Sequence, residues 1–190
     1  KKNLDYVKSN YSKDQFQIFD YFDLDKWAKY FALSDVLKMF HGTVTKSVKL
    51  YYNPTTRLFE PIAFDGHYQS GYQDFSFIDF INNPEIKCGY ACSNRSWYSL
   101  FFNKKNKSFI ERYYFYMDLY TSDNYQDKIV DYSDNQLQKI NNFFYSEYQS
   151  SDRIFFKGML PYYFDISAIK KRSDILKKKI LKNGIKKSTT

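Results

Sequence analysis

The sequence predicts an α+β protein that is mostly helical and carries one small β-hairpin. Apolar residues recur at helical spacing in four segments, at 24–39, 107–122, 133–151 and 163–181. Two short segments rich in β-branched and aromatic residues flank an Asn-Pro turn, which is the pattern of a hairpin. No apolar run approaches the ~18 residues that a membrane-spanning helix needs, so we expect no transmembrane segment.

The length of 190 residues fits a single domain with short extensions. We expect a lead-in at 1–22, one domain at 23–182 and a basic tail at 183–190. The aromatic fraction of 22% is high. It can indicate a binding surface, but we interpret it as the codon bias of an AT-rich genome, because Lys, Asn and Ile are also abundant.

The first helix is predicted from about Leu24 to Met39. Asp23 is a suitable N-cap, because its carboxylate can accept hydrogen bonds from the free backbone N–H groups of the first turn. Asp25 adds negative charge near the positive end of the helix dipole. Gly42 is expected to follow the helix end in a left-handed conformation.

The hairpin is predicted from strands at 47–52 and 57–64, joined by the turn sequence NPTT. Asn favours the first position of such a turn, and Pro fixes φ at the second. The following segment, 66–96, is rich in glycine, acidic and amide residues and is expected to be irregular, apart from a short helix near 75–81. The hairpin therefore leads into an acidic loop that begins at Asp65.

The C-terminal helix carries the net charge of the chain. Residues 170–187 hold nine Lys or Arg and one Asp, so this segment has a charge of +8 and the rest of the chain is neutral. A nucleic acid or an anionic membrane could bind such a surface, but we favour a solvated helix face. One largely apolar stripe should pack on the body while the lysines face water. The stripe consists of Ile166, Ile169, Ser173, Leu176 and Ile180.

The two cysteines, Cys88 and Cys92, leave three interpretations open. They could form a disulfide if the chain is extracellular. They could contribute to a metal site, but that site would need two more soft ligands, and both histidines lie far away in the sequence. The third interpretation is two ordinary thiols.

A family resemblance is carried by "FHG" at 40–42 and "SVKLYYNPTTRLFEPIAFDGHY" at 47–68. Both resemble the CotH kinase-like family, the spore coat protein H group of atypical protein kinases. "FDLDKWAKYFALSDVL" is similar to the family's D-x-D helix, and "FIERYYFYMDLY" and "FDISAIKKRSDILKKKIL" are similar to its helical C-terminal part. The resemblance covers roughly 20–182. It implies a protein-kinase-like C-lobe, with the N-lobe missing.

The resemblance implies that the parent protein transfers phosphate from ATP to Ser or Thr of a coat or surface protein, with Mg²⁺ or Mn²⁺ at the site. Asp65, directly after the second strand, is the implied metal ligand, and Ser47 would share in binding the metal and the nucleotide. His41 is the implied catalytic base, a role that imidazole can fill at neutral pH. The chain would then act at a cell or spore surface, and nucleic acid is not the expected partner.

The sequence departs from the family pattern at three positions. His41 stands where the family commonly has an Asp, although many members with the YYNP form also carry His-Gly there. Ser47, or Lys46 in a different register, stands where the family has an Asn, and His67 takes the place of a second Asp in the acidic loop. Neutral His and Lys are poor ligands for Mg²⁺, which prefers hard oxygen donors.

The residues ahead of the first helix also differ from those of a complete kinase. The 22 residues that precede Asp23 contain no glycine, so a phosphate-covering loop is not expected there. We therefore expect this chain by itself to hold no nucleotide or metal tightly. An alternative function is a non-catalytic structural or interaction module of the same fold. A third is a helical domain that binds nucleic acid through the lysine-rich tail.

Overall fold

The structure is a computed structural model that describes residues 17–66, 75–86, 94–147 and 166–182. The chain is mostly helical with one two-stranded antiparallel sheet, which confirms the predicted α+β class. In chain order the elements are η1 (Ile18–Asp20), α2 (Leu24–Val36), η2 (Phe40–Thr43), β1 (Lys49–Asn53), β2 (Leu58–Ile62), α3 (Phe77–Asn82), α4 (Arg95–Phe101), α5 (Lys107–Thr121), α6 (Asp123–Glu147) and α8 (Ile166–Lys182).

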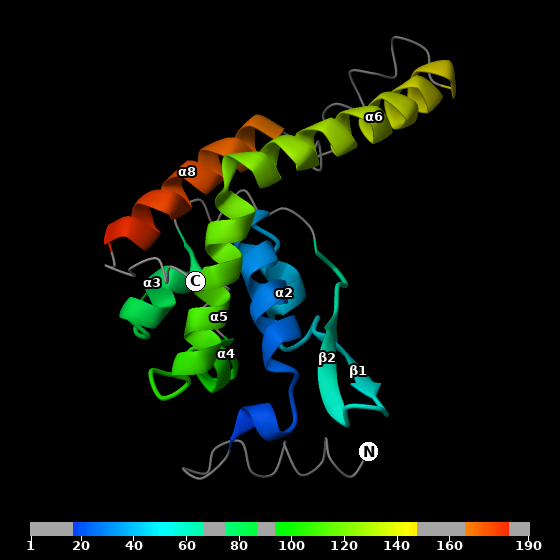
Figure 1. Cartoon of the computed structure of the whole chain (residues 1–190). Coiled ribbons are helices and arrows are strands. Elements are labelled where there is room, and N and C mark those ends of the chain that lie inside the picture. Colours follow the sequence, from blue (N-terminus) through cyan, green and yellow to red (C-terminus); the bar gives the residue numbers. More distant parts are fainter. Residues whose placement is uncertain (1–16, 67–74, 87–93, 148–165, 183–190) are drawn as a thin grey trace.

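Helices α2 and α5 pack side by side in the centre of the molecule (Figure 1). The hairpin of β1 and β2 lies against α2, on the side away from α5, and α8 crosses the far ends of α5 and α2. Helix α6 follows α5 after a sharp bend and runs out beyond the other elements. The hairpin and the loop before it therefore occupy one flank of the helical body.

The start of α2 is as predicted, but its end is not. The Asp23 carboxylate accepts a hydrogen bond of 2.9 Å from Lys26 N, which confirms the N-cap. The helix ends at Val36 rather than Met39, and the left-handed residue is Lys38, with a φ of 53°, rather than Gly42. A hydrogen bond of 2.8 Å from Met39 N to Ser34 O closes this end in the pattern of a Schellman motif. The prediction that Gly42 takes the left-handed position at the end of this helix is therefore wrong.

The hairpin forms where it was predicted, with shorter strands. Asn53 Oδ1 accepts a hydrogen bond of 2.9 Å from Thr55 N, as expected for the first residue of the turn. Strand β2 is fixed to the body through Phe59, whose N–H donates to Tyr21 O at 2.6 Å and whose carbonyl accepts from Trp27 Nε1 at 2.9 Å. Strand β1 is thus the outer strand of the sheet.

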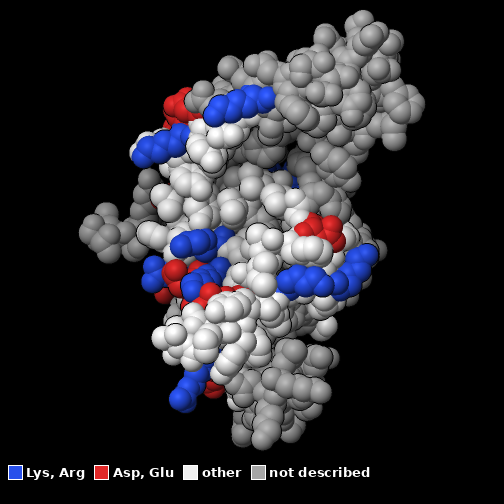
Figure 2. Space-filling view, turned by 90° about the vertical axis from the view of Figure 1, so that its right-hand side faces the viewer, with Lys and Arg blue, Asp and Glu red and all other residues white. Residues whose placement is uncertain are grey.

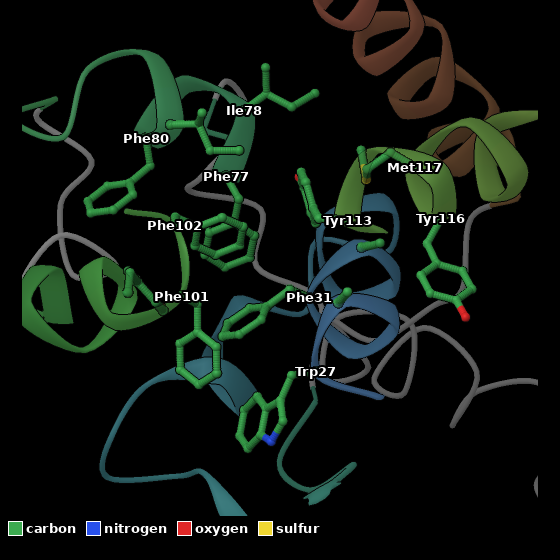
Figure 3. Packing of buried hydrophobic residues seen from close by; sticks show 14 of the residues in the cluster. Trp27, Phe31, Phe77, Ile78, Phe80, Phe101, Phe102, Tyr113, Tyr116 and Met117 are labelled. Atoms are coloured by element: carbon green, nitrogen blue, oxygen red, sulfur yellow. The ribbon is translucent and has the colours of Figure 1, made fainter. Parts of the chain in front are cut away.

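Aromatic side chains fill the core, which gives a physical use to the high aromatic content. Trp27, Phe31, Phe77 and Phe102 are all buried, and Figure 3 shows their rings packed between the helices. The rings of Phe31 and Phe77 meet edge to face with their centroids 5.0 Å apart, and those of Phe77 and Phe102 are stacked at 4.9 Å. Such contacts add to the stabilisation that burial itself provides.

The helices after the hairpin agree with the sequence in part. Helix α3 coincides with the short helix predicted near 75–81, and α5 buries most of its predicted stripe. Helix α4 was not predicted, because it is short and lies beside a segment interpreted as irregular. Helix α6 begins at Asp123 rather than near Ser133, since Ser122 is extended and accepts from Tyr125 N at 3.3 Å through its hydroxyl.

Helix α8 packs on α5 and α2 through its predicted stripe. Ile169, Ser173, Leu176 and Ile180 are buried; Ile166 lies among the side chains that the structure does not describe. Arg172 is also buried, which the sequence did not indicate. Its Nη2 lies 2.5 Å from Asp35 Oδ1 in α2, and both side chains are inaccessible to solvent. This ion pair fixes α8 to the centre of the fold.

Candidate functional site

The structure brings together three of the residues that the sequence predicted for the site. Asp65 Oδ2 lies 2.8 Å from His41 Nδ1 and 3.0 Å from Ser47 Oγ. Ser47 Oγ also lies 3.3 Å from His41 Nδ1. Ser47 is buried, whereas the Asp65 side chain is 36% exposed, so the group reaches the surface through its carboxylate. We call these three residues the Asp65 cluster.

The open end of the hairpin positions the cluster. Ser47 precedes β1 and Asp65 follows β2, and pairing of Lys49 with Ile62 brings these two chain segments together. A turn closed by a hydrogen bond of 2.9 Å from Ser47 N to the carbonyl of Val44 returns the chain from η2 toward β1. His41, in η2, is thereby placed opposite the same carboxylate.

Gly42 allows the segment after β2 to approach η2 closely. A Cβ at Gly42 would lie 2.6 Å from Phe64 O and 3.0 Å from the Tyr30 hydroxyl. The next residue after Phe64 is Asp65, whose φ of 52° is left-handed, a conformation that the short polar side chain of Asp tolerates better than most. Because Gly42 has no side chain, the backbone at Phe64 can pack against it, and this close approach places Asp65 near His41.

We expect Gly42→Ala to lower the free energy of unfolding by about 1–3 kcal/mol, because the new methyl group would collide with the backbone at Phe64. Urea denaturation measures the loss. Gly66→Ala is the matched control, since its Cβ would meet the flexible end of the Met39 side chain, which can move aside. Equal losses in the two variants would show that close approach at Gly42 is not what matters.

Side chains of α4 and of its N-cap residue hold the loop that carries His41 and Ser47. Trp97 Nε1 donates to Thr43 O at 3.0 Å, and Asn94 Oδ1 accepts from the Thr45 hydroxyl at 2.7 Å. The Tyr98 hydroxyl lies 3.0 Å from Thr43 Oγ1. Sequence reasoning missed these supporting residues, because they lie 49 to 55 residues after their partners in the loop and belong to an unpredicted helix and its N-cap.

Tyr30 supports the loop from the other side. Its hydroxyl donates to the Gly42 carbonyl at 2.7 Å. Burial raises the pKa of Tyr30 to about 12, so the hydroxyl keeps its proton at neutral pH. Tyr30 therefore acts as a constant donor that fixes the backbone between His41 and Thr43.

The geometry of the cluster differs from that of a nucleophilic serine triad. In such a triad the carboxylate binds one imidazole nitrogen and the serine hydroxyl gives its proton to the other. Here Asp65 and Ser47 both lie at Nδ1 of His41, and the Ser47 hydroxyl donates to Asp65. The arrangement therefore does not match the geometry of a serine-hydrolase triad.

Two arginines whose side chains could meet phosphate, Arg95 and Arg112, are engaged with carboxylates instead. Arg95 pairs with Glu85 at 2.5 Å and Arg112 pairs with Asp25 at 3.2 Å, so both arginines make surface ion pairs. The remaining sequence candidates, His67, Cys88 and Cys92, lie outside the residues that the structure describes. Within the described residues, no three or more His, Cys, Asp or Glu side chains are grouped so that they could hold a metal ion by themselves.

No family model, curated protein or solved structure matches this chain significantly. None of the helices in the described ranges has both the length and the apolar character needed to cross a membrane.

Proposed function

We propose that this chain supplies the metal-binding and proton-accepting side of a phosphoryl-transfer site, as the C-lobe of a CotH-like atypical Ser/Thr kinase. The observation that carries the proposal is the convergence of His41 and Ser47 on the Asp65 carboxylate, at 2.8 Å and 3.0 Å. These three residues stand at the site positions that the family resemblance implies. The acceptor, a Ser or Thr of a coat or surface protein, is implied by the resemblance alone.

The donor set of the cluster fits a hard divalent cation that shares its coordination with phosphate. Proteins commonly hold Mg²⁺ by one or two carboxylates, and phosphate oxygens and water complete its shell. Asp65 offers the carboxylate, and the Ser47 hydroxyl is a second oxygen donor. When bound, the cation would neutralise charge on the phosphates. The imidazole of His41 is a poor ligand for such an ion, so we assign it a different role.

His41 is suited to accept a proton. When its Nδ1–H is donated to Asp65 Oδ2, the neutral ring presents Nε2 as its basic nitrogen. That nitrogen can take the proton of an acceptor hydroxyl as the hydroxyl oxygen attacks phosphorus. The imidazolium that forms is stabilised by the adjacent carboxylate, as in other His–Asp pairs. Asp65 would thus serve both the cation and the base.

Asp65→Asn is expected to reduce phosphotransfer by at least about 100-fold, because the amide has a similar shape but no charge to bind the cation or to stabilise the imidazolium. The measurement is transfer of labelled phosphate from Mg·ATP to a protein acceptor by the full-length protein. A second readout is Mn²⁺ binding, followed by electron paramagnetic resonance on the 190-residue chain.

Asp118→Asn is the matched control, since Asp118 is an exposed carboxylate on α5. It should leave phosphotransfer and Mn²⁺ binding unchanged. The metal role is wrong if the Asp65→Asn protein transfers phosphate and binds Mn²⁺ as well as the original chain does.

A non-catalytic structural or interaction module of the same fold is the second candidate function. One observation favours this function: Asp65 Oδ2 accepts a hydrogen bond from Ser47 and also lies against His41. Asp65 could therefore act as a latch, that is, a purely structural link between the end of the hairpin and the loop before it. A latch predicts that Asp65→Asn lowers the free energy of unfolding by about 1–3 kcal/mol, while the unmutated full-length protein transfers no phosphate and the unmutated chain shows no Mn²⁺ binding that depends on Asp65. The same set of measurements therefore separates the two functions.

A further inference from the structure

The charges of α8 fall into two sets. One set points toward neighbouring elements, where each cation has an acidic partner. These pairs are Lys170 with Asp127, Arg172 with Asp35, Lys177 with Asp123 and Lys179 with Asp79. About half of the positive charge on the helix is therefore used to hold the helix against the rest of the fold.

The second set lies along the outer side of the helix. Lys171, Lys178 and Lys182 are exposed, and none of them makes an ion pair with another described residue. An α-helix turns by about 100° per residue, so these three positions fall within about 40° of one another around the helix axis. The helix rises by about 1.5 Å per residue, so they span about 16 Å along that axis. The three lysines therefore form a row along α8, on the side of the helix that faces away from the other elements.

Two large apolar side chains flank the row of lysines. Ile175 is 40% exposed and Leu181 is 76% exposed. Asp174 is the one acidic residue on this side of α8. On the hairpin side of the molecule, by contrast, blue and red atoms lie near one another (Figure 2). We call Lys171, Asp174, Ile175, Lys178, Leu181 and Lys182 the outer face of α8.

We propose that the outer face of α8 binds an anionic lipid surface. Lysines along a helix attract anionic headgroups, and aliphatic side chains beside them can enter the boundary between headgroups and acyl chains. The sequence continues with Lys186 and Lys187, which add to the net positive charge of the C-terminal segment. The apolar stripe of α8 is occupied by α5 and α2, so the helix lies flat on the surface and binds mainly through charge.

The chemistry of the face favours lipid over nucleic acid. Single-stranded nucleic acid is usually held by aromatic side chains that stack on bases, together with a basic groove. The outer face has no aromatic residue and no arginine, and its lysines alternate with Ile and Leu. These aliphatic groups gain nothing from a phosphate backbone in water, whereas a bilayer can bury them.

The experiment is co-sedimentation of the 190-residue chain with vesicles of phosphatidylcholine alone or mixed with phosphatidylserine. Binding should require phosphatidylserine and should weaken as salt rises, because the charges are screened. Replacing Lys171, Lys178 and Lys182 by Gln together should weaken partitioning on the order of 100-fold, since each lysine near an anionic surface contributes about 5-fold. Ile175→Ser combined with Leu181→Ser should weaken it further.

The matched control replaces three other exposed lysines by Gln: Lys104 and Lys105 in the turn before α5, and Lys107 at its first position. It makes the same change in net charge and should leave most of the binding in place. Equal binding to both kinds of vesicle, or equal loss in the two triple variants, would overturn the proposal. Tighter binding to single-stranded DNA than to phosphatidylserine vesicles, unaffected by the Ile175 and Leu181 changes, would assign the face to nucleic acid instead.

Discussion

Arg172→Met is expected to lower the free energy of unfolding by about 3–5 kcal/mol, because it leaves the Asp35 carboxylate buried without its charged partner. Arg172 Nη2 lies 2.5 Å from Asp35 Oδ1 and also donates to Phe75 O, so one side chain joins α8 to α2 and to the segment before α3. Most domains of this size have a total stability of about 5–15 kcal/mol. Chemical denaturation of the purified chain measures the change.

The loss in Arg172→Met should depend on pH. Burial raises the pKa of Asp35, whereas the charge of Arg172 and the hydrogen bonds from Tyr113 and Phe77 act in the opposite sense. Without Arg172 the folded-state pKa rises further above the unfolded value of about 4, so the folded state holds a proton that the unfolded state has released. Stability of the variant is then highest below about pH 4 and falls as the pH rises through the folded pKa.

The difference from the original chain should therefore be smaller at about pH 4 than at about pH 7. Lys171→Met, at the neighbouring exposed position of the same helix, is the matched control and should change stability by less than about 0.5 kcal/mol. If Arg172→Met were no more harmful than Lys171→Met, the buried pair would not be what anchors α8.

Trp27→Ala is expected to cost about 3–5 kcal/mol, since it removes a large side chain from the middle of the aromatic core. Trp27 is fully buried. The centroid of its ring lies 4.9 Å from the ring centroid of Phe101 and 5.8 Å from that of Trp97. Its Nε1 also donates to Phe59 O in β2 at 2.9 Å. The substitution would thus open a cavity and release the hairpin from α2 at the same time.

The same substitution should loosen the loop of the Asp65 cluster, because Trp97, which rests against Trp27, donates to the Thr43 carbonyl. Denaturation gives the overall loss, and hydrogen exchange at β1, β2 and residues 40–48 gives the local effect. Phe115→Ala is the control, since that ring is 54% exposed on α5. Unchanged exchange in the hairpin of the Trp27→Ala protein would contradict the proposed link.

Much of the candidate site could be predicted from the sequence, because its parts are encoded locally. Asp65 follows a hairpin whose turn residues specify it, and His41 and Ser47 lie in the loop that leads into the hairpin. An antiparallel pair must bring the residues before its first strand close to those after its second. Their proximity therefore followed from the strand assignment, whereas the distances and the shared oxygen of Asp65 did not.

The role of Gly42 shows the limit of local reasoning. A glycine a few residues after a helix commonly marks the helix end, and that expectation was wrong because Lys38 takes the left-handed position itself. The reason for glycine at 42 is the carbonyl of Phe64, which arrives from beyond the hairpin. No pattern near Gly42 in the sequence reveals which backbone will pack against it.

Three kinds of element could be predicted because their signals lie within a few residues of one another: the cap at Asp23, the Asn53 turn, and the apolar stripes of α5 and α8. Hydrogen bonding and side-chain periodicity act over one or two turns of chain, so they can be read without the fold. The burial of Arg172 against Asp35, by contrast, appears only in the packed fold. A lysine-rich helix gives no reason to expect a buried cation. The buried position of Arg172, with the Asp35 carboxylate beside it, forms only when α2, α5 and α8 pack together.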